Sequence, residues 1–319
     1  MAKLSVEPEF PDHPDNILEG KVYPMKKAVY TMGQRLGRGA FGTVYKICRK
    51  SDKAEFAMKV EKIKPGQKKE EGIQLEMEIL VKMKGELNTL RYMVLTLLGP
   101  SIGELKDERK NLFLATGLRV LNQLFDALEE LHGRGFIHRE IHPRNLCIGL
   151  GRQKAIVYLL DFGLARRYAT EKLTWMTPRA KATGKGHGDY KAIACHMQKE
   201  LGPKEDCESA VYLFVSLVKG ERISDGARKG HSSLPWENSN ISPSEILKKK
   251  QDLQNGKGRL ALLGGLKWTE SLWKIYEYTF IIYYGVRVNY SHIRGLIKDA
   301  AKSAGVSLDA PFEWEKEDA

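Results

Sequence analysis

Short runs in which hydrophobic and polar side chains alternate dominate the N-terminal third of the chain. Residues 29–60 show this period of two, with glycines between the runs, and residues 92–99 form a further hydrophobic run. Such alternation is typical of strands that bury one face. Residues 73–85 carry hydrophobic side chains at helical spacing and end on a glycine, which predicts one helix between the two regions.

The remainder of the chain is mainly helical in pattern. Two short strand-like runs, at residues 146–150 and 156–163, interrupt it. Segments with a hydrophobic helical face, or hydrophobic throughout, cover residues 118–131, 206–218, 271–283 and 290–301. Strands first and helices later predict an α+β chain with a small β-rich lobe and a larger helical lobe.

Two stretches of the small lobe depart from a regular pattern. Residues 1–25 show neither period and are expected to form an extended or disordered lead. Only eight residues, 84–91, separate the predicted helix from the strand that follows it. A strand of ~5 residues with two connections of ~2 to 6 residues rarely fits such a length. One strand of the sheet is therefore expected to be missing or badly shortened.

Composition narrows the class of protein. The chain has 319 residues, enough for two lobes with substantial cores. Its four cysteines form no CxxC pair, which disfavours a zinc site and favours an intracellular chain with free thiols. The N-terminus has no hydrophobic core typical of a signal peptide. The longest hydrophobic stretch, residues 272–286, carries Lys274 and Glu277, so we expect a buried helix and not a membrane span.

A glycine array follows the first predicted strand. Gly37, Gly39 and Gly42 form the pattern GxGxxG, in which backbone amides can approach phosphate oxygens without an intervening Cβ. Dinucleotide-binding folds share this spacing but continue into a helix, whereas "TVYKI" after Gly42 is strand-like. The array therefore predicts a β-hairpin that covers ATP, with a plain glycine-rich hairpin as the alternative.

Charged and polar residues further along complete a nucleotide site. Lys59 lies in "FAMKV", and Glu76 on the predicted helix is placed to pair with it and hold it against the α- and β-phosphates, although Glu78 competes for this role. Asn145 ends "HREIHPRN" and Asp161 begins "DFG". Both supply hard oxygen ligands that suit Mg²⁺ on nucleotide phosphates. This ordered set predicts a protein kinase-like fold.

The chain resembles the protein kinase superfamily from about Tyr30 to Trp314. Within it, the chain looks like the casein kinase 1 group, especially the branch expanded in nematodes and related to tau tubulin kinases. The stretches that carry this resemblance are "LLGPS", "NLCIGLG", "YLLDFGLARRY", "KEDCESAVY" and "SLPW". The group lacks the usual Ala-Pro-Glu triplet, and this chain has "YKAIACH" at that place.

The resemblance implies a bilobal kinase domain over residues 26–316, with a small lobe of about 26–98 and a large lobe of about 99–316. It implies ATP and Mg²⁺ between the lobes, Ser/Thr proteins as substrates, and Asp206 as support for the catalytic loop. A monomer in the cytoplasm is expected, with the nucleus as the alternative location and with no membrane or specific nucleic-acid partner. The residues expected at the nucleotide are Leu36, Gly37, Gly39, Gly42, Val44, Ala57, Lys59, Glu76 and, in the hinge, Leu97.

The catalytic loop departs from the family pattern. Glu140 stands for the aspartate that accepts the substrate proton, and His142 for a lysine that contacts the transferring phosphate. Glutamate is about as basic as aspartate, with a pKa of ~4.3 against ~3.9. Its added methylene displaces the carboxylate, and a displacement of about 1 Å can lower a rate on the order of 10²-fold. A neutral histidine also stabilises phosphate charge less than a lysine does.

Residues on the side of the site that would bind the phosphate-accepting substrate, here called the acceptor side, depart from the family pattern at further positions. His187 and Asp189 stand where the family has threonine and arginine, and no third ligand accompanies His142 and His187, which disfavours a metal site there. The net charge of +12 suits acidic or phospho-primed protein substrates, although a solvated basic surface explains it equally. The basic residues around the activation segment are Arg166, Arg167, Lys172, Arg179, Lys181 and Lys185.

Two functions therefore stay open. The first is a Ser/Thr kinase of reduced activity, in which Lys59, Asn145 and Asp161 hold Mg-ATP and Glu140 is the catalytic base. The second is a pseudokinase that binds ATP and acts as a scaffold or regulator. Both predict an intact nucleotide side and an altered acceptor side.

Overall fold

The chain divides into two compact units, residues 1–98 and 99–319. The structure, a computed structural model, describes residues 13–25, 28–39, 42–62, 84–87, 90–109, 112–182, 186, 188–219, 234–237, 241–254, 258–264, 266 and 269–318. The predicted helix over residues 73–85, with Glu76 and Glu78, lies outside these residues except for its last two positions, Lys84 and Gly85. These two residues belong to a strand, so the predicted helix is wrong at this end. The predicted limits of the domain at residues 26 and 316 stay predictions.

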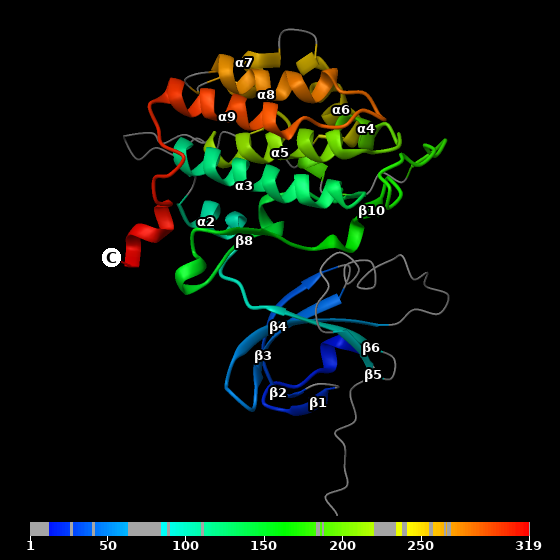
Figure 1. The fold of residues 1–319 in the computed structure, drawn as a ribbon, viewed down its shortest axis with the longest axis vertical. Helices are drawn as coiled ribbons and strands as arrows, with labels where there is room; N and C mark the ends of the chain where they lie inside the picture. Colours follow the sequence, from blue (N-terminus) through cyan, green and yellow to red (C-terminus); the bar gives the residue numbers. More distant parts are fainter. Residues whose placement is uncertain are drawn as a thin grey trace, which may run out of the picture. The chain divides into compact units, whose positions relative to one another are not determined.

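The first unit is a six-stranded antiparallel sheet with the order β1-β2-β3-β4-β6-β5 (Figure 1). The alternating pattern is confirmed, since Tyr45 and Met58 lie opposite one another on neighbouring strands and are both buried. The strands are β1 (Val22–Met25), β2 (Ala28–Gly39), β3 (Gly42–Arg49), β4 (Glu55–Lys62), β5 (Lys84–Leu87) and β6 (Leu90–Thr96).

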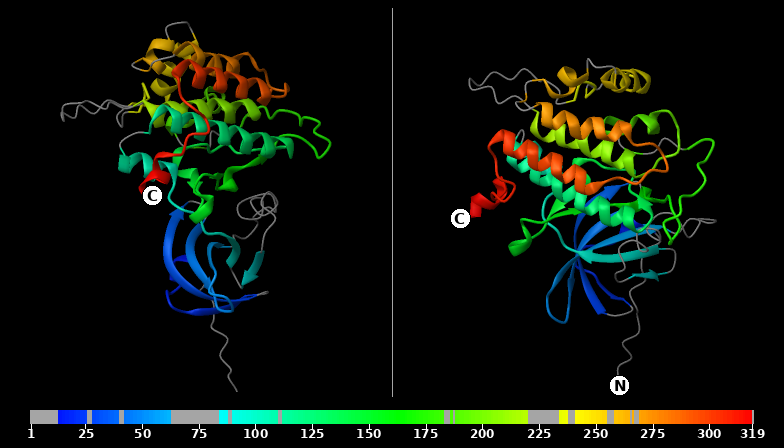
Figure 2. Two further views of the ribbon diagram at one scale, coloured as in Figure 1. Left: turned by 60° about the vertical axis from the view of Figure 1, so that its left-hand side comes forward. Right: turned by 45° about the horizontal axis from the view of Figure 1, so that its top comes forward.

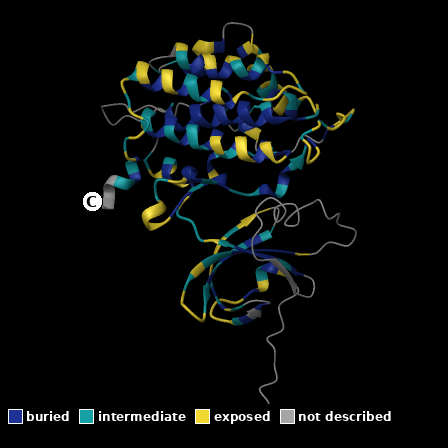
Figure 3. Ribbon diagram, viewed as in Figure 1, coloured by how far each residue is buried: buried dark blue, intermediate teal, exposed yellow. Residues whose placement is uncertain are grey.

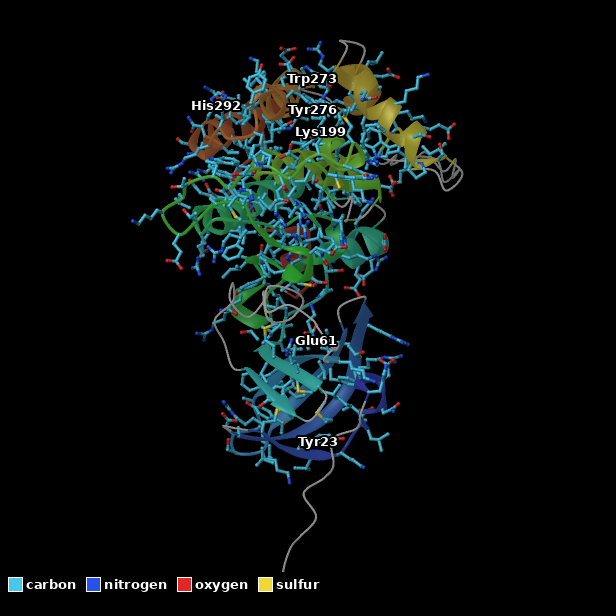
Figure 4. The ribbon with its side chains drawn as sticks, turned by 90° about the vertical axis from the view of Figure 1, so that its right-hand side faces the viewer. Tyr23, Glu61, Lys199, Trp273, Tyr276 and His292 are labelled. Atoms are coloured by element: carbon cyan, nitrogen blue, oxygen red, sulfur yellow. The ribbon has the colours of Figure 1, made fainter. Side chains whose placement is uncertain are left out.

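One face of this sheet is covered by residues that precede it in the chain. The short helical turn η1 (Pro14–Asn16) leads to β1, which pairs with β2. Ile17 and Tyr23 are buried in the same cluster as Tyr45 and Met58, and Tyr23 is labelled in Figure 4. The expectation of an extended or disordered lead is therefore wrong for residues 13–25, because these side chains bury against the sheet.

The short edge of the sheet agrees with the prediction of a shortened strand. Strand β5 has four residues and pairs antiparallel with β6, to which residues 88–89 connect it. The strand is thus shortened and not missing. A two-residue connection is the length that antiparallel neighbours allow, which explains how eight residues suffice.

The second unit is helical, with two small antiparallel strand pairs. Its helices are α2 (Ile102–Arg109), α3 (Leu114–Gly133), α4 (Ile193–His196), α5 (Pro203–Val218), α6 (Pro243–Asp252), α7 (Gly258–Leu263), α8 (Thr269–Ile281) and α9 (Tyr290–Ala304). Its strands are β7 (Phe136–Ile137) with β10 (Arg166–Arg167), and β8 (Leu146–Ile148) with β9 (Val157–Leu159). Short turns of 3-10 helix are η2 (Pro143–Asn145), η3 (Gly151–Gln153), η4 (Phe162–Leu164), η5 (Gly188–Tyr190) and η7 (Glu313–Asp318).

Helix α5 forms the centre of the second unit. It packs against α3 and α8, and α9 packs against both of these helices (Figure 2). Nearly every residue of α5 is buried, so it is dark blue along its length in Figure 3. Its second half, Ala210–Val218, is almost entirely hydrophobic, as expected for a central helix, whereas its first half buries Glu205, Asp206 and Glu208.

The hydrophobic stretch at residues 272–286 begins inside helix α8, as predicted. Trp273 and Tyr276, labelled in Figure 4, are buried, and the Tyr276 hydroxyl lies 3.2 Å from that of Tyr212 on α5. Within the described part of the chain, no helix has the length and hydrophobicity to cross a membrane.

Candidate active site

The glycine-rich hairpin joins β2 and β3, as the sequence predicts. Gly39 pairs with Gly42 and Gly37 with Val44 across this hairpin. Gly42 has φ +122°, and a Cβ there would lie 2.2 Å from the Val60 carbonyl oxygen on β4. Only glycine fits that position without moving the sheet. A Cβ at Gly37 or Gly39 would meet no described atom within 4 Å, so the space beside these two glycines is open.

Three predicted nucleotide residues share the other face of the sheet. Val44 and Lys59 are directly opposite on β3 and β4, and Ala57 lies two residues before Lys59 on the same face. Lys59 is only 6% exposed. A lysine buried on a sheet face is positioned by packing, as a phosphate ligand must be. Leu36 is exposed at an irregularity of β2, and Leu97 follows the end of β6.

The catalytic loop of the second unit is bound to Asp206 on α5. The two carboxylate oxygens of Asp206 accept hydrogen bonds from the backbone amides of His138, at 2.6 Å, and Arg139, at 2.8 Å. His132 Nε2 lies 2.9 Å from the same carboxylate. Burial by itself would raise the pKa of Asp206, but the hydrogen bond and charge of His132 hold it below its usual value. The role that the resemblance assigned to Asp206 agrees with this geometry.

His138 orients the next part of the loop. Its Nε2 lies 2.9 Å from the Leu160 carbonyl oxygen, which can only accept, so Nε2 carries the proton. Its Nδ1 then accepts a bond from the backbone amide of Glu140, at 3.3 Å. Burial lowers the pKa of His138, which agrees with a neutral ring that donates on one side and accepts on the other.

Two residues of the site have strained backbone. Arg139 has φ +70° and Asp161 has φ +60°, in the left-handed region that side chains disfavour. Such strain persists where surrounding contacts specify it, and it gathers at functional sites. Arg139 also donates from Nε to the Leu164 carbonyl at 2.6 Å, and the Asp161 carboxylate accepts from the Gly163 amide at 3.3 Å.

The predicted metal ligands lie next to one another. The Leu160 amide donates to the Asn145 carbonyl at 2.8 Å, and the strand pair β8–β9 thereby places Asp161 beside Asn145. Asn145 donates its side-chain amide to the Glu140 carbonyl at 2.9 Å. This bond assigns the Nδ2 end of the amide to the loop, so Oδ1 is the end able to bind a cation. The donor chemistry fits Mg²⁺ on a nucleotide.

Glu140 itself is partly buried and borders a small recess of the second unit. Tyr190, Lys191 and Ala192 also line this recess. The His142 ring lies 6.4 Å from the Tyr190 ring. His187 lies outside the described residues, so its predicted approach to His142 is untested. No cluster of three or more His, Cys, Asp or Glu suited to a metal occurs among the residues that the structure describes.

The basic residues of the activation segment differ in their surroundings. Arg179 forms a paired contact with Glu200, at 2.7 and 2.9 Å, and Arg166 lies 3.7 Å from the same carboxylate. Burial lowers the pKa of Arg139, and the charges of Arg166 and Arg179 lower it further, so the three guanidinium groups are neighbours. The sequence predicts no role for Glu200, because nothing in its local pattern marks it. Arg167 lies over the Phe136 ring, Lys172 and Lys181 are exposed, and Lys185 is not described.

Comparison with known proteins also indicates a protein kinase domain. A family model described as "Protein kinase domain" matches residues 30–253. A protein of Dictyostelium discoideum described as a "Probable serine/threonine-protein kinase" is 29% identical over 307 residues, which cover 91% of this chain and 57% of that protein. The serine/threonine-protein kinase spe-6 of Caenorhabditis elegans is 28% identical over 293 residues, covering 87% of this chain and 73% of that protein. The chain thus spans little more than half of the first relative.

Proposed function

The chain belongs to the protein kinase family, and from this premise we propose that it transfers the γ-phosphate of ATP to serine or threonine hydroxyls of proteins. One observation carries the proposal. Asp206 holds the catalytic loop from α5, and the Glu140 carbonyl of this loop accepts a hydrogen bond from the side-chain amide of Asn145. This arrangement provides both a base and a cation site from one continuous hydrogen-bonded network.

The proposed roles follow from the chemistry of each side chain. The acceptor hydroxyl oxygen attacks the γ-phosphorus, the bond to the β–γ bridging oxygen breaks, ADP leaves, and Glu140 takes the hydroxyl proton. Lys59 binds phosphate oxygens of the nucleotide, and Asn145 and Asp161 hold Mg²⁺. When bound, the cation neutralises charge on the phosphate oxygens. The glycine-rich hairpin contributes backbone amides.

We further propose casein kinase 1-like substrates, which carry acidic or already phosphorylated residues. The net charge of +12 and the group formed by Arg139, Arg166 and Arg179 support this preference. Glu200 already binds Arg179, so the exposed Lys172 and Lys181 are better placed to contact an acidic peptide. Replacing both by glutamate should weaken binding of an acidic peptide, and more so at low salt. Equal binding of acidic and basic peptides by the parent at low salt would contradict the preference.

The function itself is tested by radiolabel transfer from ATP to casein, with Lys59→Ala as the control. The melting temperature is measured with and without Mg-ATP in parallel. A ligand at ~100 times its dissociation constant raises the free energy of unfolding by about 2.7 kcal/mol. Transfer that Lys59→Ala abolishes supports the kinase. A melting shift without transfer by the parent would replace it with the pseudokinase alternative. Absence of both would contradict nucleotide binding altogether.

A further inference from the structure

Lys250 on α6 has an environment unusual for a lysine. Its side chain is fully buried, at 0% exposure, although lysine is among the residues least often buried. The Nζ atom donates to the Asp189 carbonyl at 2.8 Å and to the Lys191 carbonyl at 2.6 Å. It also lies 4.7 Å from the centre of the Tyr212 ring and 4.8 Å from that of Trp236. The amine is therefore enclosed by two carbonyl acceptors and two aromatic faces.

Trp236 makes a second contact with the same piece of backbone. Its indole Nε1 donates to the Asp189 carbonyl at 2.8 Å, so one carbonyl accepts from both residues. The two carbonyls bound by Lys250 lie on either side of Tyr190, whose hydroxyl donates to Ser216 Oγ on α5 at 3.2 Å. Residues 189–191 are thereby held by Lys250 on α6, by Ser216 on α5 and by Trp236.

This segment is the one that lies beside the candidate base. Tyr190 and Lys191 line the recess that Glu140 borders. The family's usual Ala-Pro-Glu triplet is absent from this stretch, so its glutamate is not available to fix the segment. Among the described contacts, the carbonyls of this segment accept hydrogen bonds from two donors outside it, Lys250 and Trp236.

We propose that Lys250 is a positioning residue for phosphotransfer, which, together with Trp236, holds the backbone of residues 189–191 beside Glu140 for the acceptor protein. The proposal rests on the proposed kinase function. Within the described residues, the hydrogen bonds of Lys250 go to Asp189, Lys191 and His196 and not to Glu140 or the predicted nucleotide ligands, so it acts through the two carbonyls. Its removal should therefore affect the acceptor protein and leave ATP binding unchanged.

The test compares two variants with a matched control. Lys250→Met keeps a long unbranched side chain and removes the donors, and Trp236→Phe removes only the indole N–H and keeps an aromatic ring. Lys248→Met makes the same charge change on the exposed side of α6. Each protein is assayed for KM of casein, KM of ATP and kcat, for the melting shift with Mg-ATP, and for the rate of tryptic cleavage after Lys191.

We expect Lys250→Met, which removes two hydrogen bonds to the segment, to raise the KM for casein about tenfold, and Trp236→Phe, which removes one, to raise it about threefold. The KM for ATP and the Mg-ATP melting shift should match those of the parent, and cleavage after Lys191 should become faster. Lys248→Met should match the parent throughout. A merely structural lysine would lower the melting temperature without separating the two KM values.

Unchanged casein KM and unchanged cleavage in both variants would overturn the proposal, as would an equal rise in the KM values for casein and ATP. If Lys250→Met does not fold, Trp236→Phe carries the test with the same criteria. If the parent transfers no phosphate, the proposed function fails, and cleavage after Lys191 then decides the positioning alone. Faster cleavage in the variants supports it, and unchanged cleavage contradicts it.

Discussion

Each of the two units uses one aspartate to hold a functional loop, but the two aspartates differ in their access to water. In the first unit, Asp15 accepts from Thr43 Oγ1 at 2.8 Å and pairs with Arg38 at 2.9 Å, both on the glycine-rich hairpin. In the second, Asp206 accepts two backbone amides of the catalytic loop. The Asp15 side chain is 19% exposed and its partner Arg38 is 64% exposed, whereas Asp206 is 2% exposed.

This difference in burial should decide what each aspartate contributes. Asp15 is partly exposed and its cationic partner Arg38 is exposed, so water can replace much of this contact and its removal should change little. A buried carboxylate with several donors leaves those donors unsatisfied when it is removed. The nucleotide hairpin is thus held in an adjustable way, and the catalytic loop is held firmly.

Asp206→Ala should have the largest effect of the substitutions considered. Removing one partner from a buried charged network costs about 3 to 5 kcal/mol, here because His132 and two backbone amides lose their acceptor. Chemical denaturation measures the loss. Asp107→Ala is the control, since Asp107 pairs with Arg144 at 2.8 Å on the surface and should change stability by less than about 1 kcal/mol. Similar losses in the two variants would refute the comparison.

Substitutions of Glu140 test whether the catalytic loop supports phosphotransfer. Glu140→Gln removes the proton acceptor and should lower phosphotransfer about 10²-fold or more. Glu140→Asp should raise it if the longer side chain is misplaced, and should lower it if the loop has adapted to glutamate. Radiolabel transfer is compared after equal ATP binding is verified by melting. Equal transfer by the parent and Glu140→Gln would show that another group takes the proton.

Lys250 shows how burial affects a basic group in the same way that Asp206 shows it for an acidic one. Burial lowers the pKa of Lys250 to about 7, against opposing charges from Glu208 and Asp189. An unfolded lysine has a pKa of about 10.4, so between these values the unfolded chain binds more protons and stability rises with pH. The gain from pH 7 to pH 9 is at most about 2.7 kcal/mol. The titratable groups that face Lys250 are Asp189, Lys191, Cys195, His196, Glu208 and Tyr212.

The measurement is melting of the parent and of Lys250→Met between pH 6 and pH 9. The parent should gain stability relative to the variant as the pH rises, because the variant has no amine to titrate. Burial lowers the pKa of His196 to about 4, which is below this range. A difference between the two proteins that stays constant with pH would show that Lys250 is not a depressed amine.

Asp15→Asn should have the smallest effect. The Asn side chain still accepts from Thr43, and only the attraction to the exposed Arg38 is lost. We expect an increase of about twofold in the KM for ATP and no measurable change in the KM for casein. Steady-state kinetics at low and high salt measure both, with Asp52→Asn as the control, since Asp52 pairs with Arg49 elsewhere on the sheet. A tenfold change would mean that the exposed pair matters as much as a buried one.

Local sequence patterns predicted most of the elements correctly. The strand pattern of residues 29–60 became β2, β3 and β4, and the helical patterns became α3, α5, α8 and α9. The adjacency of Asn145 and Asp161 also follows from local order, because the strands between them form a short hairpin. These features depend on residues close in the chain, where periodicity reports directly which side chains are buried.

Other features were not predicted, because they depend on packing between distant segments. Residues 13–25 lack a clear period, yet Ile17 and Tyr23 are buried on the sheet. Glu200 binds Arg179 from 21 residues away. Such side chains have ordinary local sequences, and only their partners distinguish them from surface residues.

The sequence by itself determined the order of strands and helices and the glycines of the hairpin, and it supplied the residues predicted to bind nucleotide and cation. Only the tertiary structure decided which charges are buried. Lys250 is one of three consecutive lysines, and no property of that run separates it from Lys248. It is buried because α6 directs it toward carbonyls 61 and 59 residues earlier in the chain. Burial is a property of the packed neighbours, and the free energy of a charge depends on those neighbours more than on its own residue type.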